Sequence, residues 1–126
     1  MAKILLIEDD NDQILLYHTV FKMNGFNIIS AIDGKIGLDR AKNEHPDLII
    51  LDLNMEEMSG EEVIKRLKKN PETKNIPVII LTNMDKRKFQ SQMLELGAEY
   101  FWEKTVVMPP DVVKKVRDFL EKNKIK

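Results

Sequence analysis

Acidic side chains follow two apolar runs of this 126-residue chain, and their types point to one kind of chemistry. The segment Glu8-Asp9-Asp10 follows the apolar run at residues 4–7, and Asp52 follows the run at residues 48–51. Runs without polar alternation are typical of strands buried on both faces of a parallel sheet. Because sites in such sheets form beyond the carboxyl ends of the strands, we expect these acids to meet in one cleft.

Carboxylates gathered in one cleft need a compensating positive charge. Two like charges about 4 Å apart repel by roughly 4 kcal/mol at an effective dielectric constant near 20. Either one carboxyl group is protonated or a cation binds among them. Since oxygen ligands without Cys or His suit a hard cation, the pattern favours Mg²⁺. The same acids would repel the bare phosphate of a flavin or a dinucleotide.

Two further residues could complete a site for phosphoryl transfer. Thr82 ends the apolar run at residues 77–82, and Lys104 follows the aromatic run at residues 100–102. Asp52 could attack phosphorus and become an acyl phosphate, while Lys104 and the Thr82 hydroxyl could contact the phosphoryl oxygens. Each residue taken alone has an ordinary explanation, as a helix-capping acid, a strand residue or a surface charge. Their positions at the ends of consecutive strands favour the site.

Five strands alternating with five helices are expected to position these residues. The first helix is expected to bury an apolar face, and a capping box of Ser59 and Glu62 is expected to start the third. This alternation predicts an α/β fold with a doubly wound, flavodoxin-like parallel sheet of order 2-1-3-4-5. The expected strands span residues 4–7, 26–32, 48–51, 77–82 and 100–102. The apolar face of the first helix is expected to contain Ile14, Leu15, Leu16, Val20, Phe21 and Met23.

Length and composition narrow the class of protein. The length predicts a single domain over residues 1–126 without an output domain. With 20 basic and 21 acidic residues, the net charge is -1, which gives no indication of direct nucleic acid binding. No apolar run has the length of a membrane span, no signal peptide is evident, and cysteine is absent. These features predict a cytoplasmic protein without disulfides or a membrane partner.

Together these motifs resemble the receiver domain of two-component response regulators. The resemblance covers essentially the whole chain and implies the receiver fold of a stand-alone regulator of the chemotaxis or phosphorelay type. No single motif is specific, but the combination is. The matching segments are ILLIED at residues 4–9, DLIILDLNMEEMSG at 47–60, PVIILT at 77–82 and GAEYFWEK at 97–104.

The resemblance implies a phosphoacceptor and a set of metal ligands. Asp52 would accept a phosphoryl group from a histidine kinase or a phosphotransfer protein. Asp9 and Asp52 would ligate Mg²⁺ directly, together with the backbone carbonyl of Asn54, while Glu8 would act through water. The chain would catalyse only its own phosphorylation and dephosphorylation, so it is not expected to be an enzyme acting on an outside substrate.

The resemblance also implies a switch. Thr82 and Lys104 would contact the phosphoryl group, and movement of Thr82 would let Phe101, at the aromatic switch position, turn inward. This shift in population would alter the surface of the fourth helix, fifth strand and fifth helix. A downstream protein, whose identity the sequence does not indicate, would bind that surface. The protein is expected to be a monomer or a weak homodimer.

Three positions depart from the family pattern. Glu56 replaces the usual proline, so the loop after Asp52 is expected to be softer. Asn83 replaces a small residue and is expected to crowd phosphoryl entry. Thr105 replaces a cis proline, and since a cis bond to a non-proline residue costs roughly 2.5–4 kcal/mol, we expect a trans Lys104–Thr105 bond and a reshaped loop.

Two other functions compete with the switch. A receiver-like module that only docks and is never phosphorylated fits Asn83 and Thr105, but the full set of acids, threonine and lysine argues against it. A Mg²⁺-dependent phosphohydrolase would need an acid two residues after the nucleophile, where this chain has Asn54. The basic segment Lys86-Arg87-Lys88 is either an ordinary solvated helix face, which is the more common case, or a docking patch for an acidic partner.

Overall fold

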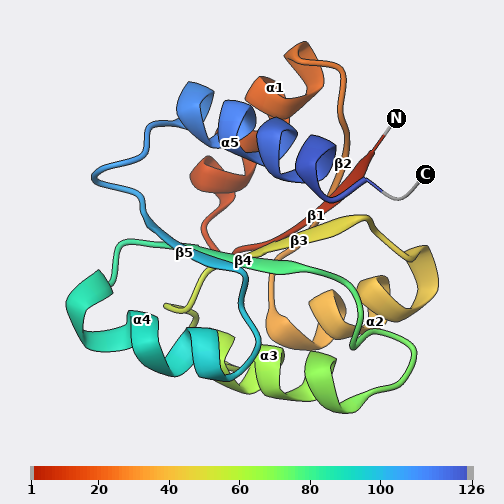
Figure 1. The fold of residues 1–126 in the computed structure, drawn as a ribbon, viewed down its shortest axis with the longest axis vertical. Coiled ribbons are helices and arrows are strands. Elements are labelled where there is room, and N and C mark those ends of the chain that lie inside the picture. The colour runs from red at the N-terminus through yellow and green to blue at the C-terminus, as the bar shows by residue number, and fades with distance from the viewer. Residues whose placement is uncertain (1, 125–126) are drawn as a thin grey trace.

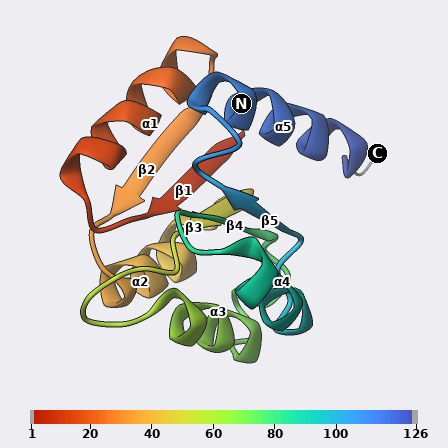
Figure 2. The ribbon, with the colours of Figure 1, turned by 90° about the vertical axis from the view of Figure 1, so that its left-hand side faces the viewer.

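The described part of the chain, residues 2–124 of a computed structural model, alternates strands and helices throughout. Residues 1, 125 and 126 of the expected 1–126 domain lie outside the described residues. The elements are β1 (Lys3–Ile7), α1 (Asn11–Met23), β2 (Asn27–Ala31), α2 (Gly34–Glu44), β3 (Leu48–Leu51), α3 (Gly60–Lys69), β4 (Val78–Thr82), α4 (Lys86–Glu95), β5 (Tyr100–Glu103) and α5 (Pro109–Lys122). Helices α1 and α5 cover one face of the sheet, and α2, α3 and α4 cover the other (Figures 1 and 2).

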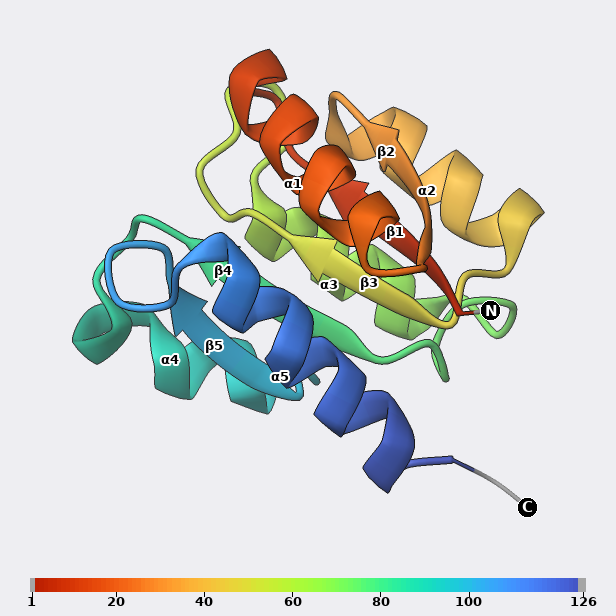
Figure 3. The same ribbon diagram turned by 90° about the horizontal axis from the view of Figure 1, so that it is seen from above.

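The sheet has the strand order β2-β1-β3-β4-β5 with every neighbouring pair parallel, which confirms the predicted order. Strand β3 lies in the middle, where Leu51 pairs with Ile7 on one side and with Ile80 on the other (Figure 3). All four residues of β3 are fully buried because helices cover both of its faces. The central strands therefore end at the same edge of the sheet.

Two apolar cores lie on the two faces of the sheet. Alternate strand residues point to opposite faces, so Ile49, Leu51, Ile80 and Phe101 pack toward α2, α3 and α4. The residues between them on the same strands pack toward α1 and α5. This second core contains Ile4, Leu6, Tyr17, Phe21, Ile28, Leu48, Ile50, Ile79, Leu81, Val107, Val112, Val113, Val116 and Phe119.

The predicted apolar face of α1 is confirmed at Ile14, Val20 and Phe21, which pack in the second core. It is wrong at Leu15, Leu16 and Met23, which are exposed. The helix buries Tyr17 and Phe21, while Leu15 is 67% exposed and Met23 is 79% exposed. Positions 14, 17 and 21 lie on one stripe of a helix, and Leu15 falls outside that stripe. None of the helices within residues 2–124 has the length and apolar character needed to span a membrane.

Polar caps fix the start of the helices around the sheet. The Ser59 hydroxyl accepts a hydrogen bond from the backbone N–H of Glu62 at 3.3 Å, so α3 begins where expected. The reciprocal half of the predicted capping box is not formed, because the Glu62 carboxylate pairs with Arg66 one turn later at 2.8 Å. The start of α3 thus depends on one side-chain cap.

Gly60 lets the start of α3 approach the end of β3 closely. A Cβ atom on Gly60 would lie 2.5 Å from the carbonyl oxygen of Asp52 and 2.6 Å from the Cα of Leu53. Both neighbours are backbone atoms, so they cannot rotate away. Gly37 makes a comparable approach, because its Cβ would lie 2.6 Å from a side-chain carbon of the buried Ile7. The glycines that weaken helix propensity therefore allow close helix–sheet packing.

Replacing Gly60 by Ala is expected to lower the free energy of unfolding by about 1–3 kcal/mol, the usual cost of overpacking. The sign is informative, because Ala without this contact would stabilise a helix by about 1 kcal/mol relative to Gly. Urea unfolding at 25 °C measures the change. Gly25→Asn is the control, since Gly25 has φ +86°, which Asn tolerates, and open space around it. An unchanged or raised stability in Gly60→Ala would contradict the packing argument.

Candidate functional site

Residues at the carboxyl ends of four strands come together at one edge of the sheet. Glu8 follows β1 and Asp52 follows β3, and the backbone N–H of Asp52 donates to the Ile7 carbonyl at 3.1 Å. Thr82 is the last residue of β4, and the backbone N–H of Lys104 donates to the Thr82 carbonyl at 2.8 Å. Backbone pairing thus continues past the strand ends and aligns these residues side by side.

The Lys104 ammonium bridges two buried carboxylates. Its Nζ donates to Glu8 Oε1 at 2.6 Å and to Asp52 Oδ2 at 3.3 Å. The side chains of Lys104, Glu8 and Asp52 are only 9%, 3% and 8% exposed. Lys104 is therefore an internal cation and not a surface charge, and the two acids share it.

The buried group carries more negative than positive charge, and this affects Glu8. Burial raises the pKa of Glu8 to about 7, the nearby charge of Asp52 adds to the rise, and Lys104 opposes it. Burial pulls the pKa of Lys104 down, but its hydrogen bond to Glu8 and the charges of both acids outweigh burial, so the pKa of Lys104 is raised overall. Lys104 stays charged while Glu8 exchanges its proton near neutral pH.

The loop between β3 and α3 is held by two acids of the site. The backbone N–H of Asn54 donates to Asp52 Oδ1 at 3.1 Å, and the backbone N–H of Glu56 donates to Asp9 Oδ2 at 3.2 Å. Asp9 also lines a cavity of about 260 Å³ together with Glu56 and neighbouring residues of this loop. Asp9 and Asp52 therefore both contact the loop that carries Asn54.

Fewer acids converge than the sequence suggested. Asp10 accepts hydrogen bonds from the backbone N–H groups of Asp12 and Gln13, so it caps α1. Glu8 is bound to Lys104, and among residues 2–124 no three Asp, Glu, His or Cys side chains are grouped closely enough to hold a metal ion by themselves. Asp9 and Asp52 also remain at this edge of the sheet, and their carboxylates accept hydrogen bonds from the loop that carries Asn54.

Thr82 and Phe101 lie on the other face of the sheet. Thr82 is fully buried, and its hydroxyl accepts a hydrogen bond from the backbone N–H of Met84 at 3.3 Å. Phe101 pairs with Ile80 in the sheet and is only 2% exposed in the core under α4. The expected inward turn of Phe101 therefore has no outward starting position in this structure, because the ring already lies inside.

The three departures from the family pattern are all at the surface of the site. Glu56, Asn83 and Thr105 are exposed. The described residues contain no cis peptide bond, which confirms the predicted trans Lys104–Thr105 bond. The N–H groups of Val106 and Val107 both donate to the Glu103 carbonyl, so the chain forms a tight turn after β5.

Sequence reasoning missed one residue near this edge of the sheet. Tyr17 on α1 is 2% exposed, and the charges of Lys104, Glu8 and Asp52 act on its hydroxyl. The spacing of Ile14, Tyr17 and Phe21 could have identified it as an inward residue, but a count of purely apolar residues passes over tyrosine.

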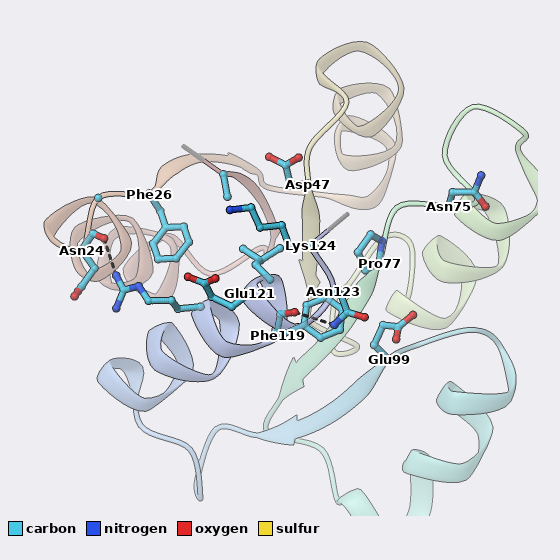
Figure 4. Close-up of a pocket in the computed structure, with 14 residues that line it drawn as sticks. Asn24, Phe26, Asp47, Asn75, Pro77, Glu99, Phe119, Glu121, Asn123 and Lys124 are labelled. Carbon is cyan, nitrogen blue, oxygen red and sulfur yellow. Dashed lines mark hydrogen bonds between the residues drawn. The ribbon is translucent and has the colours of Figure 1, made fainter. Parts of the chain in front are cut away.

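A second cavity is remote from these residues. It has a volume of about 1000 Å³ and lies at the amino ends of the strands, next to Asp47 before β3, Pro77 before β4 and Glu99 before β5 (Figure 4). At its rim, Arg117 donates to the Asn24 carbonyl at 2.8 Å. The cavity is open and is not part of the strand-end site.

The pKa of Glu8 predicts a pH-dependent stability. Its value in the folded protein, about 7, exceeds the ordinary 4.5, so the fold favours the protonated form and loses stability as pH rises from about 4.5 to about 7. The Glu8→Gln variant keeps the shape without the charge. We subtract the unfolding free energy of the parent from that of Glu8→Gln, both measured in the presence of a chelator. This difference should be larger at pH 8 than at pH 5 by on the order of 2 kcal/mol. Glu57→Gln controls for the loss of one exposed negative charge, and a gap that does not change with pH would contradict the burial of Glu8.

Comparison with known proteins identifies the family. Residues 4–117 match the model of the response regulator receiver domain. The chain is 33% identical over 110 residues to the polar-differentiation response regulator DivK of Brucella ovis, covering 86% of this chain and 89% of DivK. It is 34% identical over 105 residues to the response regulator PleD of Caulobacter vibrioides, covering 83% of this chain but only 23% of PleD.

A solved structure agrees with the sequence matches. The Mn²⁺-bound form of response regulator Rcp1 superposes with a TM-score of 0.79 at 27% identity, covering 100% of this chain and 98% of Rcp1. The fold, the buried lysine between two acids at the strand ends and the match over residues 4–117 agree with one another. The chain therefore belongs to the receiver domains of response regulators, the family of two-component signalling.

Proposed function

We propose that this chain is a phosphorylation-controlled switch in which Asp52 accepts a phosphoryl group. The observation that carries the proposal is the Lys104 ammonium, which bridges Glu8 and Asp52 at a buried strand end. Asp52 is 6% exposed and hydrogen-bonded through both oxygens, to Asn54 and to Lys104. A carboxylate held in this way is positioned as a nucleophile, with a cation beside it to neutralise incoming negative charge.

The transfer step would use the residues at the strand ends. An Asp52 oxygen attacks the phosphorus of a phosphohistidine on a histidine kinase or a phosphotransfer protein. The new oxygen–phosphorus bond forms as the phosphorus–nitrogen bond breaks, and the leaving imidazole nitrogen takes up a proton. Lys104 neutralises a phosphoryl oxygen, and the Thr82 hydroxyl donates to another once it leaves Met84. Hydrolysis would turn the switch off. Water attacks the phosphorus of the acyl phosphate, and inorganic phosphate and the free Asp52 carboxylate are released.

The oxygen ligands fit Mg²⁺. Asp9, Asp52 and the Asn54 carbonyl would hold the ion, with Glu8 acting through water, and the bound ion would neutralise charge on the transferred phosphoryl group. A site with two carboxylates and no all-protein cage is the arrangement that Mg²⁺ favours, because it keeps several waters and binds phosphate oxygens. The Mn²⁺-bound form of Rcp1 supports a divalent cation at such a site.

Phosphorylation would change which protein partner binds the surface formed by α4, β5 and α5. Phe101 lies under α4 in the core that also contains Ile80, so a movement of Thr82 at the end of β4 would disturb this packing. On the same surface of the molecule, Lys86, Arg87 and Lys88 are exposed at the start of α4. We infer a cytoplasmic signalling protein, monomeric or weakly dimeric, that catalyses no reaction on an outside substrate and does not bind nucleic acid.

Intact-protein mass spectrometry after incubation with acetyl phosphate tests the phosphoacceptor. The parent protein should gain one phosphoryl group in the presence of Mg²⁺ and none with a chelator. Asp52→Asn should gain none, because the amide is a poor nucleophile. The matched control is Asp47→Asn, the same chemical change at the opposite end of β3, where the acid accepts from the Lys3 N–H. Asp47→Asn should be modified like the parent. Absence of modification in the parent would favour the docking-only module.

Asn83→Ala separates a crowded site from an inactive one. If the Asn83 side chain hinders phosphoryl entry, its removal should raise the rate of Asp52 phosphorylation by acetyl phosphate by about threefold or more. The reason is that a hindered donor adopts the orientation needed for attack less often. The rate is followed by quenched time points in the same mass assay. Asn75→Ala, at an exposed residue near the other end of the sheet, is the control. Equal rates for both variants and the parent would show that Asn83 does not restrict entry.

A further inference from the structure

Tyr17 lies on the same face of the sheet as the charged group of the site. Side chains two residues apart on a strand point to the same face. Ile50 faces α1 and α5, and Asp52 follows it by two positions; Trp102 and Lys104 are related in the same way. Tyr17 is part of that core. The tyrosine and the Lys104–Asp52 pair therefore occupy the same side of the sheet.

The direction of α1 brings the Tyr17 hydroxyl toward the site. The helix begins at Asn11, just after the carboxyl end of β1, so its first turn lies at the edge of the sheet that carries the acids (Figure 2). Tyr17 is six residues further on, about 9 Å along the helix axis. Long side chains in helices point back toward the helix N-terminus. The phenol ring of Tyr17 therefore reaches back to the strand ends.

Electrostatics agrees with this placement. Burial raises the pKa of Tyr17, and the charges of Lys104, Glu8 and Asp52 also act on it, the lysine lowering the pKa and the acids raising it. These three residues are the ones that form the buried charged group. The hydroxyl is thus within electrostatic reach of that group and of no other charged residue that affects its pKa appreciably.

Hydrogen-bond accounting leaves one free group on each side. A lysine ammonium has three N–H donors, and Lys104 uses two of them on Glu8 and Asp52. None of the hydrogen bonds formed within residues 2–124 involves the Tyr17 hydroxyl, although the residue is 2% exposed. Within this range His18 Nε2 is the one fully enclosed side-chain polar atom without a partner. The Tyr17 oxygen is thus not fully enclosed, although it bonds no other described residue.

We propose that Tyr17 is a positioning residue whose hydroxyl oxygen is linked to the third N–H donor of the Lys104 ammonium through one water molecule. The contact would hold the ammonium in place when its present partners change. This consequence rests on the proposed phosphorylation of Asp52. As Asp52 becomes an acyl phosphate, Lys104 must exchange a carboxylate oxygen for a phosphoryl oxygen, and a third fixed partner keeps the ammonium aimed at the new one.

A high-resolution crystal structure of the unphosphorylated protein tests the contact itself. The expected result is one ordered water molecule that is hydrogen-bonded to both Tyr17 Oη and Lys104 Nζ. A hydroxyl that shares no ordered water with Lys104 would overturn the proposal. This measurement needs no phosphodonor, so it decides the contact even if Asp52 is never phosphorylated.

Kinetics of the Tyr17→Phe variant tests the consequence. The variant retains the ring and removes only the hydroxyl. The maximal rate of Asp52 phosphorylation by acetyl phosphate should fall by about three- to tenfold, less than the hundredfold or greater loss typical of a direct transition-state donor. The donor concentration at half-maximal rate should stay unchanged, because donor binding does not involve Tyr17. Urea unfolding should show a similar stability to the parent.

Tyr100→Phe is the matched control, since it makes the same change at a tyrosine that is 44% exposed on β5 and distant from the charged group. It should retain the parent rate within twofold. Equal maximal rates for Tyr17→Phe, Tyr100→Phe and the parent would overturn the positioning of Lys104 by Tyr17. If none of the three proteins is phosphorylated, the proposed function fails, and the crystal structure alone decides the contact.

Discussion

The site depends on one buried cation shared between two carboxylates. Two acids close together in a partly buried position would repel by several kcal/mol, and removing either from water carries a further cost. Lys104 offsets both effects by contacting Glu8 at 2.6 Å and Asp52 at 3.3 Å. The compensation is incomplete, because one positive charge faces two negative ones. The remaining negative charge adds to burial in raising the pKa of Glu8.

The charged group and Phe101 lie on opposite faces of the sheet. The face covered by α1 and α5 carries Asp52 and Lys104 at its edge, above a core that includes Tyr17. The opposite face carries Phe101 in the core under α2, α3 and α4. Backbone hydrogen bonding between β4 and the residue after β5 links the two faces, since the Lys104 N–H donates to the Thr82 carbonyl. A movement at the face with Lys104 can therefore be transmitted to the face with Phe101 through the pairing of β4 and β5.

Strand order and strand-end residues were accessible from the sequence because continuous apolar runs have few alternative structures. The runs before Glu8 and Asp52 had to be central, and central parallel strands must end together. Features that depend on helix phase were less accessible. Tyr17 is only 2% exposed, but its hydroxyl removes it from a count of apolar residues. Asp10 could serve either the site or the cap of the next helix. It directly follows Asp9, but its side chain caps the N-terminus of α1 and does not join the site.

Gly60 has a consequence for the motion of the loop that carries Asn54. The Gly60 N–H donates to the Leu53 carbonyl at 3.1 Å, so the loop is tied at both ends against the strand. A closed loop has lost most of its end-to-end entropy before any ligand arrives. In the middle of the loop, the Glu56 N–H donates to Asp9 Oδ2, so the loop is also attached to the strand-end site between its two ends. The entropy cost of ordering the loop is therefore already met in the folded chain, and the Asn54 backbone stays beside Asp52 without a proline at position 56.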